Sequence, residues 1–146
     1  MATIQLGPYR GVSTVMTTEL DALAATTGKA ISAAIDNSTN LDLFDDLELT
    51  VDFASAPTAG TVIEVYLLPA VDGTNYPDGS TTVLPQAGLL VAGFAVRNDT
   101  AAQRMAVRGV SLPPGSFKYL VQNTTNQAFP ATGSVLSRNP YQLQSL

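Results

Sequence analysis

Short segments in which apolar and polar residues alternate, separated by turn-forming runs, constrain the fold of this chain most strongly. In residues 47–53, leucine, valine and phenylalanine side chains alternate with Glu48, Thr50 and Asp52. A period of two places one face of a strand in a core and the other face in solvent. The turn run ASAPTAG follows, and residues 61–68 are then rich in β-branched and aromatic side chains. This pattern predicts antiparallel β-structure.

Further strands are expected along the rest of the chain. Residues 89–96 are apolar on both faces apart from Gly93, which predicts a strand buried in the middle of a sandwich. The other segments with strand patterns are residues 103–110, 117–122 and 134–139, with a weaker one at 29–35.

One short helix is expected at residues 19–23. Thr18 is a candidate N-cap, acidic residues follow in the first turn, and Gly28 ends the segment. A βαβ fold would need helical crossovers between its strands, and no other segment has the length and period for one. The sequence therefore predicts an all-β antiparallel β-sandwich, jelly-roll-like, with seven to eight strands.

The first 18 residues differ from the rest because Gly7, Pro8 and Gly11 interrupt any regular period. We expect residues 1–18 to form an extended N-terminal arm and residues 19–146 to form a single β-sandwich domain. Two interpretations of the arm are open: it adds a strand to a neighbouring subunit, or it is a frayed terminus.

The charge balance excludes some partners. The chain has a net charge of −5, and only 13% of its residues are charged. A nucleic-acid binder needs clustered cations, which are missing here. No segment has the length and apolar character of a membrane span or signal peptide, so we expect synthesis in a cytoplasm and no membrane partner. Sparse charge favours a surface that packs against other protein.

The chain contains no histidine and no cysteine. Their absence removes the commonest general base, the commonest metal ligands and thiol chemistry, so we expect neither catalysis nor a cofactor. A pair of carboxylates such as Glu48 and Asp52 is the remaining hydrolytic alternative. We interpret the carboxylates as solvent-facing strand positions; they are Asp42, Asp45, Asp46, Glu48, Asp52 and Glu64.

The run DGTNYPDGS at residues 72–80 is the most polar segment. Its Asp and Asn side chains suit calcium, but their spacing does not match an EF-hand loop, and an exposed turn is the favoured interpretation. Exposed tyrosines could mark a sugar-binding face, whereas Tyr66 and Tyr119 lie within strand patterns and are expected to pack. The candidate partner contacts are Tyr9, Arg10, Asp72, Asn75, Tyr76 and Asp78.

Four groups of residues resemble a family of small structural proteins of tailed bacteriophages. They are the helix start at residues 19–23, AIDNSTNLDL at 34–43, YLLP with DGTNY and DG at 66–79, and the LPPG, FK, L and N positions at 112–123. The resemblance extends over most of residues 17–136. It implies a capsid decoration, or cement, protein: a β-sandwich on the outer face of the major capsid lattice, commonly a trimer at threefold positions, with no catalytic residues.

Three functions are therefore considered. The first is a non-enzymatic virion protein, located on the capsid surface, that binds the major capsid protein, self-associates as a homotrimer and stabilises the shell. The alternative is a phage tail or fibre module that binds host carbohydrate or a receptor through its tyrosines and the 72–80 loop. A small hydrolase using Glu48 and Asp52 ranks third.

Overall fold

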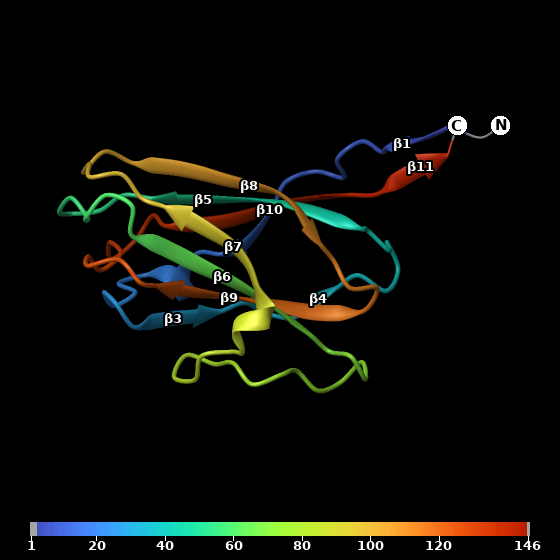
Figure 1. The fold of residues 1–146 in the computed structure, drawn as a ribbon, viewed down its shortest axis with the longest axis horizontal. Coiled ribbons are helices and arrows are strands. Elements are labelled where there is room, and N and C mark those ends of the chain that lie inside the picture. Colours follow the sequence, from blue (N-terminus) through green and yellow to red (C-terminus); the bar gives the residue numbers. More distant parts are fainter. Residues whose placement is uncertain (1–2, 146) are drawn as a thin grey trace.

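Two antiparallel sheets pack face to face in the computed structural model, which describes residues 3–145 (Figure 1). Apolar side chains from both sheets meet in one core, because strands such as β5 alternate buried and partly exposed positions along their whole length. The first sheet has the order β2 (Ser13–Met16), β10 (Val135–Tyr141), β5 (Phe44–Val51), β8 (Gln103–Ser111). The second has the order β3 (Gly28–Ile31), β9 (Ser116–Asn123), β6 (Val62–Pro69), β7 (Leu90–Ala95).

The strand order is that of a jelly roll. Strands pair in nested fashion, β2 with β10, β3 with β9, β5 with β8 and β6 with β7. A long antiparallel hairpin rolled into two sheets gives this nesting. The predicted all-β antiparallel sandwich is confirmed, and the nesting selects the jelly roll.

The predicted number of strands is too low. The described residues form eleven, because three short strands add to the eight given above: β1 (Ile4–Leu6), β4 (Ile35–Asp36), which joins the second sheet by pairing with β9, and β11 (Leu143–Ser145). Each is two or three residues long. Such segments are too short to display an alternation in the sequence.

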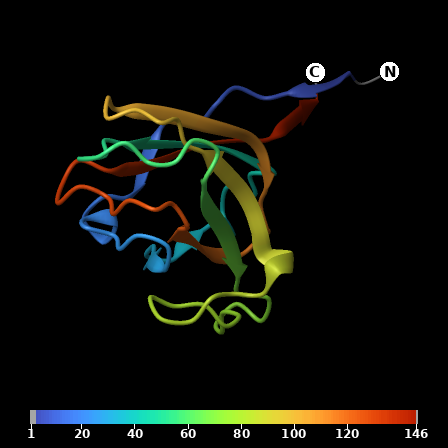
Figure 2. The ribbon, with the colours of Figure 1, turned by 60° about the vertical axis from the view of Figure 1, so that its left-hand side comes forward.

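The predicted arm is partly built into the sandwich. Strand β2 pairs with β10, and Met16 is buried in the core. Strand β1 pairs with β11 to form a two-stranded terminal ribbon that projects from one end of the body (Figures 1 and 2). Backbone hydrogen bonds from Gly7 N to Gln142 O (2.7 Å) and from Arg10 N to Pro140 O (2.9 Å) link the ribbon to the sheet.

The predicted helix is only a 3-10 turn, Thr18–Leu20, and a second one spans Ala87–Leu89. The first turn has no side-chain cap, and Ala22 follows with a φ of 51°, which ends helical geometry. Gly28 does not end a helix but begins β3, where a side chain would collide with the Ala24 backbone 2.5 Å from its Cβ position.

Strand β7 is an edge strand of the second sheet, so the prediction that residues 89–96 lie in the middle of a sandwich is wrong. Leu90, Gly93 and Ala95 are exposed, while Ala92 and Phe94 are buried. The apolar residues that made this segment look central are therefore divided between the core and solvent.

The loop that joins β6 to β7 covers the outer face of the second sheet (Figures 1 and 2). Tyr66, Leu68 and Leu120 are buried under it, and Tyr76 and Leu89 from the loop region pack against them. This cover explains why β6 is apolar on both faces. It also means that the 72–80 segment lies along a sheet, although residues 72–75 remain exposed. Among the described residues, no helix is long and apolar enough to cross a membrane.

Candidate binding groove and terminal ribbon

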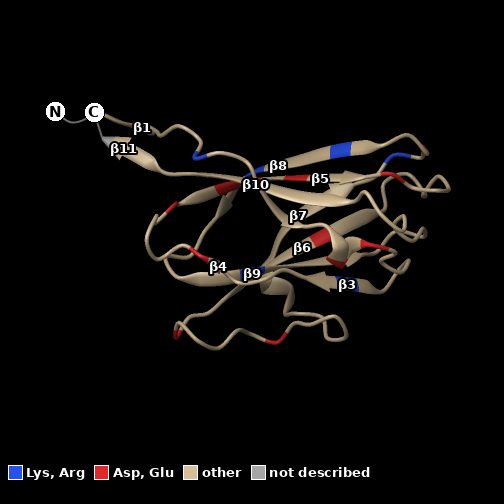
Figure 3. Ribbon diagram, turned by 180° about the vertical axis from the view of Figure 1, so that it is seen from behind, with Lys and Arg blue, Asp and Glu red and all other residues tan. Residues whose placement is uncertain are grey.

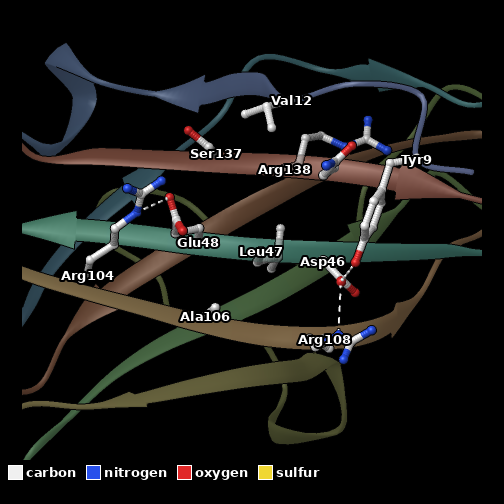
Figure 4. A pocket seen from close by; sticks show the side chains of 11 residues that line it. Tyr9, Val12, Asp46, Leu47, Glu48, Arg104, Ala106, Arg108, Ser137 and Arg138 are labelled. Atoms are coloured by element: carbon white, nitrogen blue, oxygen red, sulfur yellow. Dashed lines mark hydrogen bonds and ion pairs between the residues drawn. The ribbon is translucent and has the colours of Figure 1, made fainter.

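A groove of about 290 Å³ runs over the outer face of the first sheet (Figure 4). Its floor is formed by outward-facing residues of β5, β8 and β10, and the segment after β1 supplies one wall. Its lining residues include Tyr9, Val12, Asp46, Glu48, Arg104, Ala106, Arg108 and Ser137.

Two ion pairs lie in the groove. Arg104 Nε is 2.8 Å from a Glu48 carboxylate oxygen, and Arg108 Nε is 3.2 Å from Asp46 Oδ2. The pairing of β5 with β8 shifts beside Asp46, where Gly109 has a φ of 73°. Such a bulge re-aims the strand. Here it points the Gly109 amide at Asp46 Oδ1, 2.9 Å away.

Tyr9 closes one end of the groove. Its hydroxyl donates to Asp46, and its ring meets the ring of Tyr141 edge-on, with the centroids 5.4 Å apart. This hydrogen bond raises the pKa of Tyr9. Burial alone would raise the pKa of Asp46, but the hydrogen bonds from Tyr9, Gly109 and Arg108 outweigh burial and hold it below its ordinary value.

Arg10 fastens the same segment at a second point. Its Nε donates to Asp42, and its Nη2 donates to Asn40 O at 3.2 Å. Asp42 is buried, and its own amide donates to Asn37 Oδ1 at 2.9 Å. We call the Tyr9–Asp46 and Arg10–Asp42 contacts the arm clasp. Two of the predicted partner contacts thus bind the sandwich itself.

The remaining predicted contacts lie in the loop on the other outer face. Asp72 Oδ1 accepts the amides of Thr74 (2.9 Å) and Asn75 (2.6 Å), and Asn75 Nδ2 donates to Asp72 Oδ2 at 2.7 Å. These bonds lower the pKa of Asp72 to about 2. They show that the carboxylate organises a turn, the interpretation favoured from the sequence. Among the described residues, no group of three or more His, Cys, Asp or Glu side chains is placed to hold a metal.

Tyr76 and Asp78 both line a shallow pocket of the 72–80 loop. The half-buried Tyr76 ring packs on the second sheet, with Lys118 Nζ 4.3 Å from its centroid. Asp78 is exposed nearby. The six predicted contacts are therefore not brought together: Tyr9 and Arg10 lie by the first sheet, and the other four lie over the second.

Two carboxylates contradict the expectation that all of them face solvent, since Asp42 and Asp45 are buried. Asp45 Oδ2 accepts two hydrogen bonds, one from Tyr119 Oη of the opposite sheet at 2.9 Å and one from Arg138 Nε at 2.6 Å. Burial raises the pKa of Asp45 to about 6 against the opposing effects of Arg138 and Tyr119. The alternation in the sequence already indicated that Asp45 is buried, because it stands two residues before the buried Leu47.

Glu48 and Asp52, the carboxylates of the hydrolytic alternative, do not form a pair. Glu48 pairs with Arg104, and Asp52 lies beyond the end of β5 and is exposed. The arginines of the groove were missed as site residues. Met105 and Val107 alternate with Arg104 and Arg108, and this pattern already placed both arginines on one outer face.

The terminal ribbon has one apolar face and one polar face. Leu6 is paired with Leu143 and lies on the same face as Ile4, while Gln5 is paired with Gln144 on the other face. The exposed fractions are 70% for Ile4, 59% for Leu6 and 43% for Leu143. Neither strand contains a charged residue (Figure 3).

No protein-family model matches the sequence, and a search of curated proteins finds no match. Among solved structures, the CBM36-1 domain of a multidomain xylanase from the hindgut metagenome of Trinervitermes trinervoides is similar, with a TM-score of 0.42 and 9% identity over 100% of this chain and 97% of that chain. A family 6 carbohydrate-binding module is similar with a TM-score of 0.42 and 8% identity, over 99% of this chain and 94% of that chain. CsCBM6-3 from Clostridium stercorarium, in complex with cellobiose, has a TM-score of 0.40 and 14% identity, over 97% of this chain and 92% of that chain. Similarity this low does not bear on ligand or function.

Proposed function

We propose that this chain is a non-enzymatic structural protein that docks onto a larger protein assembly through its terminal ribbon. The observation that carries the proposal is the apolar face of the ribbon, formed by Ile4, Leu6 and Leu143, which no described part of the chain covers. An isolated two-stranded ribbon is at best marginally stable in water. Burial of this face against a partner would stabilise both the ribbon and the complex.

The edges of the ribbon also favour a protein partner. Sheet edges are usually protected by charged residues or proline, and β1 and β11 contain neither. An edge with free amide and carbonyl groups can add a strand of another chain. The arm clasp holds the base of the ribbon in one direction, and such pre-organisation lowers the entropic cost of docking.

The assembly that we propose is the capsid of a tailed phage, with the major capsid protein as partner and a homotrimer as the bound form. Support comes from the resemblance of residues 17–136 to phage structural proteins and from the low fraction of charged residues, 13%. A shell protein makes many modest interfaces, and sparse charge avoids burying ions at them. A location on the virion surface follows from this proposal.

Shells assembled without this chain provide the test. Purified wild-type protein should bind them and raise the temperature at which they release DNA, as measured by sedimentation and by dye accessibility. Ile4→Ser with Leu6→Ser removes the apolar face and should weaken binding at least tenfold. Gln5→Ser with Gln144→Ser changes the other face and serves as the matched control, with binding within twofold of wild type.

Two results would contradict the proposal. Shells that bind no wild-type protein and withstand heat equally well without it would exclude the capsid role. Equal binding by the Ile4/Leu6 and Gln5/Gln144 variants would exclude the ribbon as the docking element. Sedimentation equilibrium of the free protein tests the trimer separately.

A carbohydrate-binding module, as part of a phage tail or fibre, is the second candidate. The specific observation in its favour is the groove on the first sheet, which combines paired charges with an apolar floor. Binding of the protein to a glycan array would support this candidate. Silence across host polysaccharides would exclude it.

A further inference from the structure

The groove on the first sheet is electrically balanced. It contains the carboxylates of Asp46 and Glu48, paired with Arg108 and Arg104. A third guanidinium group, that of Arg138, also lines the groove, and its charge is matched by the buried Asp45. An anion placed here would meet a carboxylate, and a cation would meet a guanidinium group, so either would be partly repelled. The charge pattern therefore favours a neutral ligand.

The same pairs offer both kinds of hydrogen-bonding group. Both arginines use Nε for their ion pairs, and their side chains are 74% and 76% exposed. Their terminal amino groups are donors only, while the carboxylates are acceptors only. Ser137 adds a hydroxyl at the edge of the groove (Figure 4). A hydroxyl group both donates and accepts, so a ligand with several hydroxyls can bind to donors and acceptors alike.

Between the polar groups the groove is apolar. Val12 is 72% exposed and Tyr9 is 49% exposed, and the small side chain of Ala106 leaves the floor open. Ligand sites commonly combine apolar walls with a few placed polar groups. A sugar ring has C–H groups on its faces and hydroxyls around its rim, which matches this arrangement.

We infer that this groove binds a neutral saccharide, with its hydroxyls between the Glu48–Arg104 and Asp46–Arg108 pairs and a ring face on Val12, Ala106 and Tyr9. This inference rests on the second proposed function and assigns its site and ligand class. The volume of about 290 Å³ lies just below the range of about 300–1,000 Å³ typical of ligand pockets. The site is therefore sized for a short stretch of a chain.

The arm makes the site conditional on its own docking. Tyr9 and Val12 lie in the segment that the arm clasp holds against the sheet, so one wall of the groove exists only while this segment is docked. Tyr9→Phe keeps the ring but removes the hydrogen bond to Asp46. We expect this variant to weaken saccharide binding by a few fold.

Amide chemical-shift mapping of the labelled 146-residue chain tests the inference directly. The probes are cellotetraose and β-1,4-galactotriose as neutral ligands, tri-galacturonic acid as an anionic one and chitosan trimer as a cationic one. The neutral probes should shift amides of Ala106, Gly109 and Asn139. The charged probes should bind at least tenfold more weakly.

Ala106→Trp fills the groove from an exposed strand position and should weaken binding of the neutral probes at least tenfold. Ala95→Trp is the matched control, since Ala95 is an exposed strand residue on β7 of the other sheet. It should leave binding unchanged. A thermal melt of both variants verifies that each is folded.

Three outcomes would overturn the inference. Tighter binding of a charged probe would contradict the ligand class. Shifts confined to the 72–80 loop and abolished by Tyr76→Ala would leave a carbohydrate-binding module with a different site. Absence of shifts with both neutral probes, joined to silence on the glycan array, would remove the second function together with the inference.

Discussion

The two outer faces of the sandwich are built in opposite ways. The outer face of the second sheet buries Tyr66, Leu68 and Leu120 under the β6–β7 loop. The outer face of the first sheet has no such cover, and it presents ion pairs and small side chains around an open groove (Figure 4). The outer face of the second sheet is thus a second small core, and the outer face of the first sheet is open to solvent.

This difference separates stability from recognition. Burial of apolar side chains contributes most of the folding free energy, so the covered face is expected to be sensitive to substitution. Exposed ion pairs contribute little to stability, so the open face can change its chemistry at small cost. A binding site is more readily accommodated on the open face.

The largest expected effect is on the covered face. Leu120→Ala removes a fully buried side chain beneath the loop and should lower the free energy of unfolding by about 2–5 kcal/mol. Ala106→Ser on the open face should stay within about 0.5 kcal/mol of wild type. Urea denaturation measures both; similar losses in the two variants would contradict the comparison.

The adjacent aspartates of β5 sharpen the comparison between the interior and the open face. The pKa of Asp45 is raised from 3.8 to about 6, so between these pH values the folded chain holds a proton that the unfolded chain has lost. The free energy of unfolding should therefore fall as the pH rises from 4 to 6, by at most about 3 kcal/mol from this group.

The pKa of Asp46 is shifted downward instead, so its stabilising contribution is present above the unfolded pKa and is lost as the pH falls. Urea denaturation at pH 4 and 6.5 should show that Asp45→Asn lacks the decrease and that Asp46→Asn keeps it. A carboxyl NMR titration of the wild type measures the pKa of Asp45 directly; a value near 4 would contradict this prediction.

A smaller effect is expected from the arm clasp at the border of the open face. Tyr9→Phe deletes the hydroxyl that donates to Asp46 and should lower the free energy of unfolding by less than Leu120→Ala does, because this hydrogen bond is exposed to solvent. Amide exchange at Gly7 and Arg10, whose amides donate to Gln142 O just after β10 and to Pro140 O within β10, should become faster. Exchange in β6 should not change, and equal acceleration there would point to global destabilisation instead.

The smallest effect is expected within the groove. Glu48→Gln breaks an ion pair with Arg104, whose side chain is 74% exposed, and should change the free energy of unfolding by about 0.5 kcal/mol or less. The difference should shrink further in high salt. A loss comparable to that of Leu120→Ala would show that the open face is part of the stability core.

Long strands could be predicted from the sequence because their alternation is strong. The pattern at residues 47–53 identified the inward-facing Leu47 and Leu49, and both are fully buried in β5. The alternation also applied to Asp45, yet a carboxylate was assumed to face solvent. Its burial depends on Tyr119 and Arg138, which lie 74 and 93 residues away in the chain, and no local pattern reports such partners.

The groove and the ribbon could not be predicted from local sequence patterns, because both are formed by residues far apart in the chain. Tyr9 reaches Asp46 across 37 residues, and β1 meets β11 from the other end of the chain. Tyr9 and Arg10 were predicted to contact a partner, and in the structure they contact Asp46 and Asp42 of the sandwich. The loop residues Asp72 and Asn75 were interpretable because turn chemistry is local.

The nested strand order has a mechanical consequence for the ribbon. Because β1 and β11 are the outermost pair, a force that pulls them apart would break the hydrogen bonds between them one after another. Force on both strands together would instead pass along β2 and β10 into the body without separating the pair. A partner that contacts both strands of the ribbon would therefore load the protein without separating this pair.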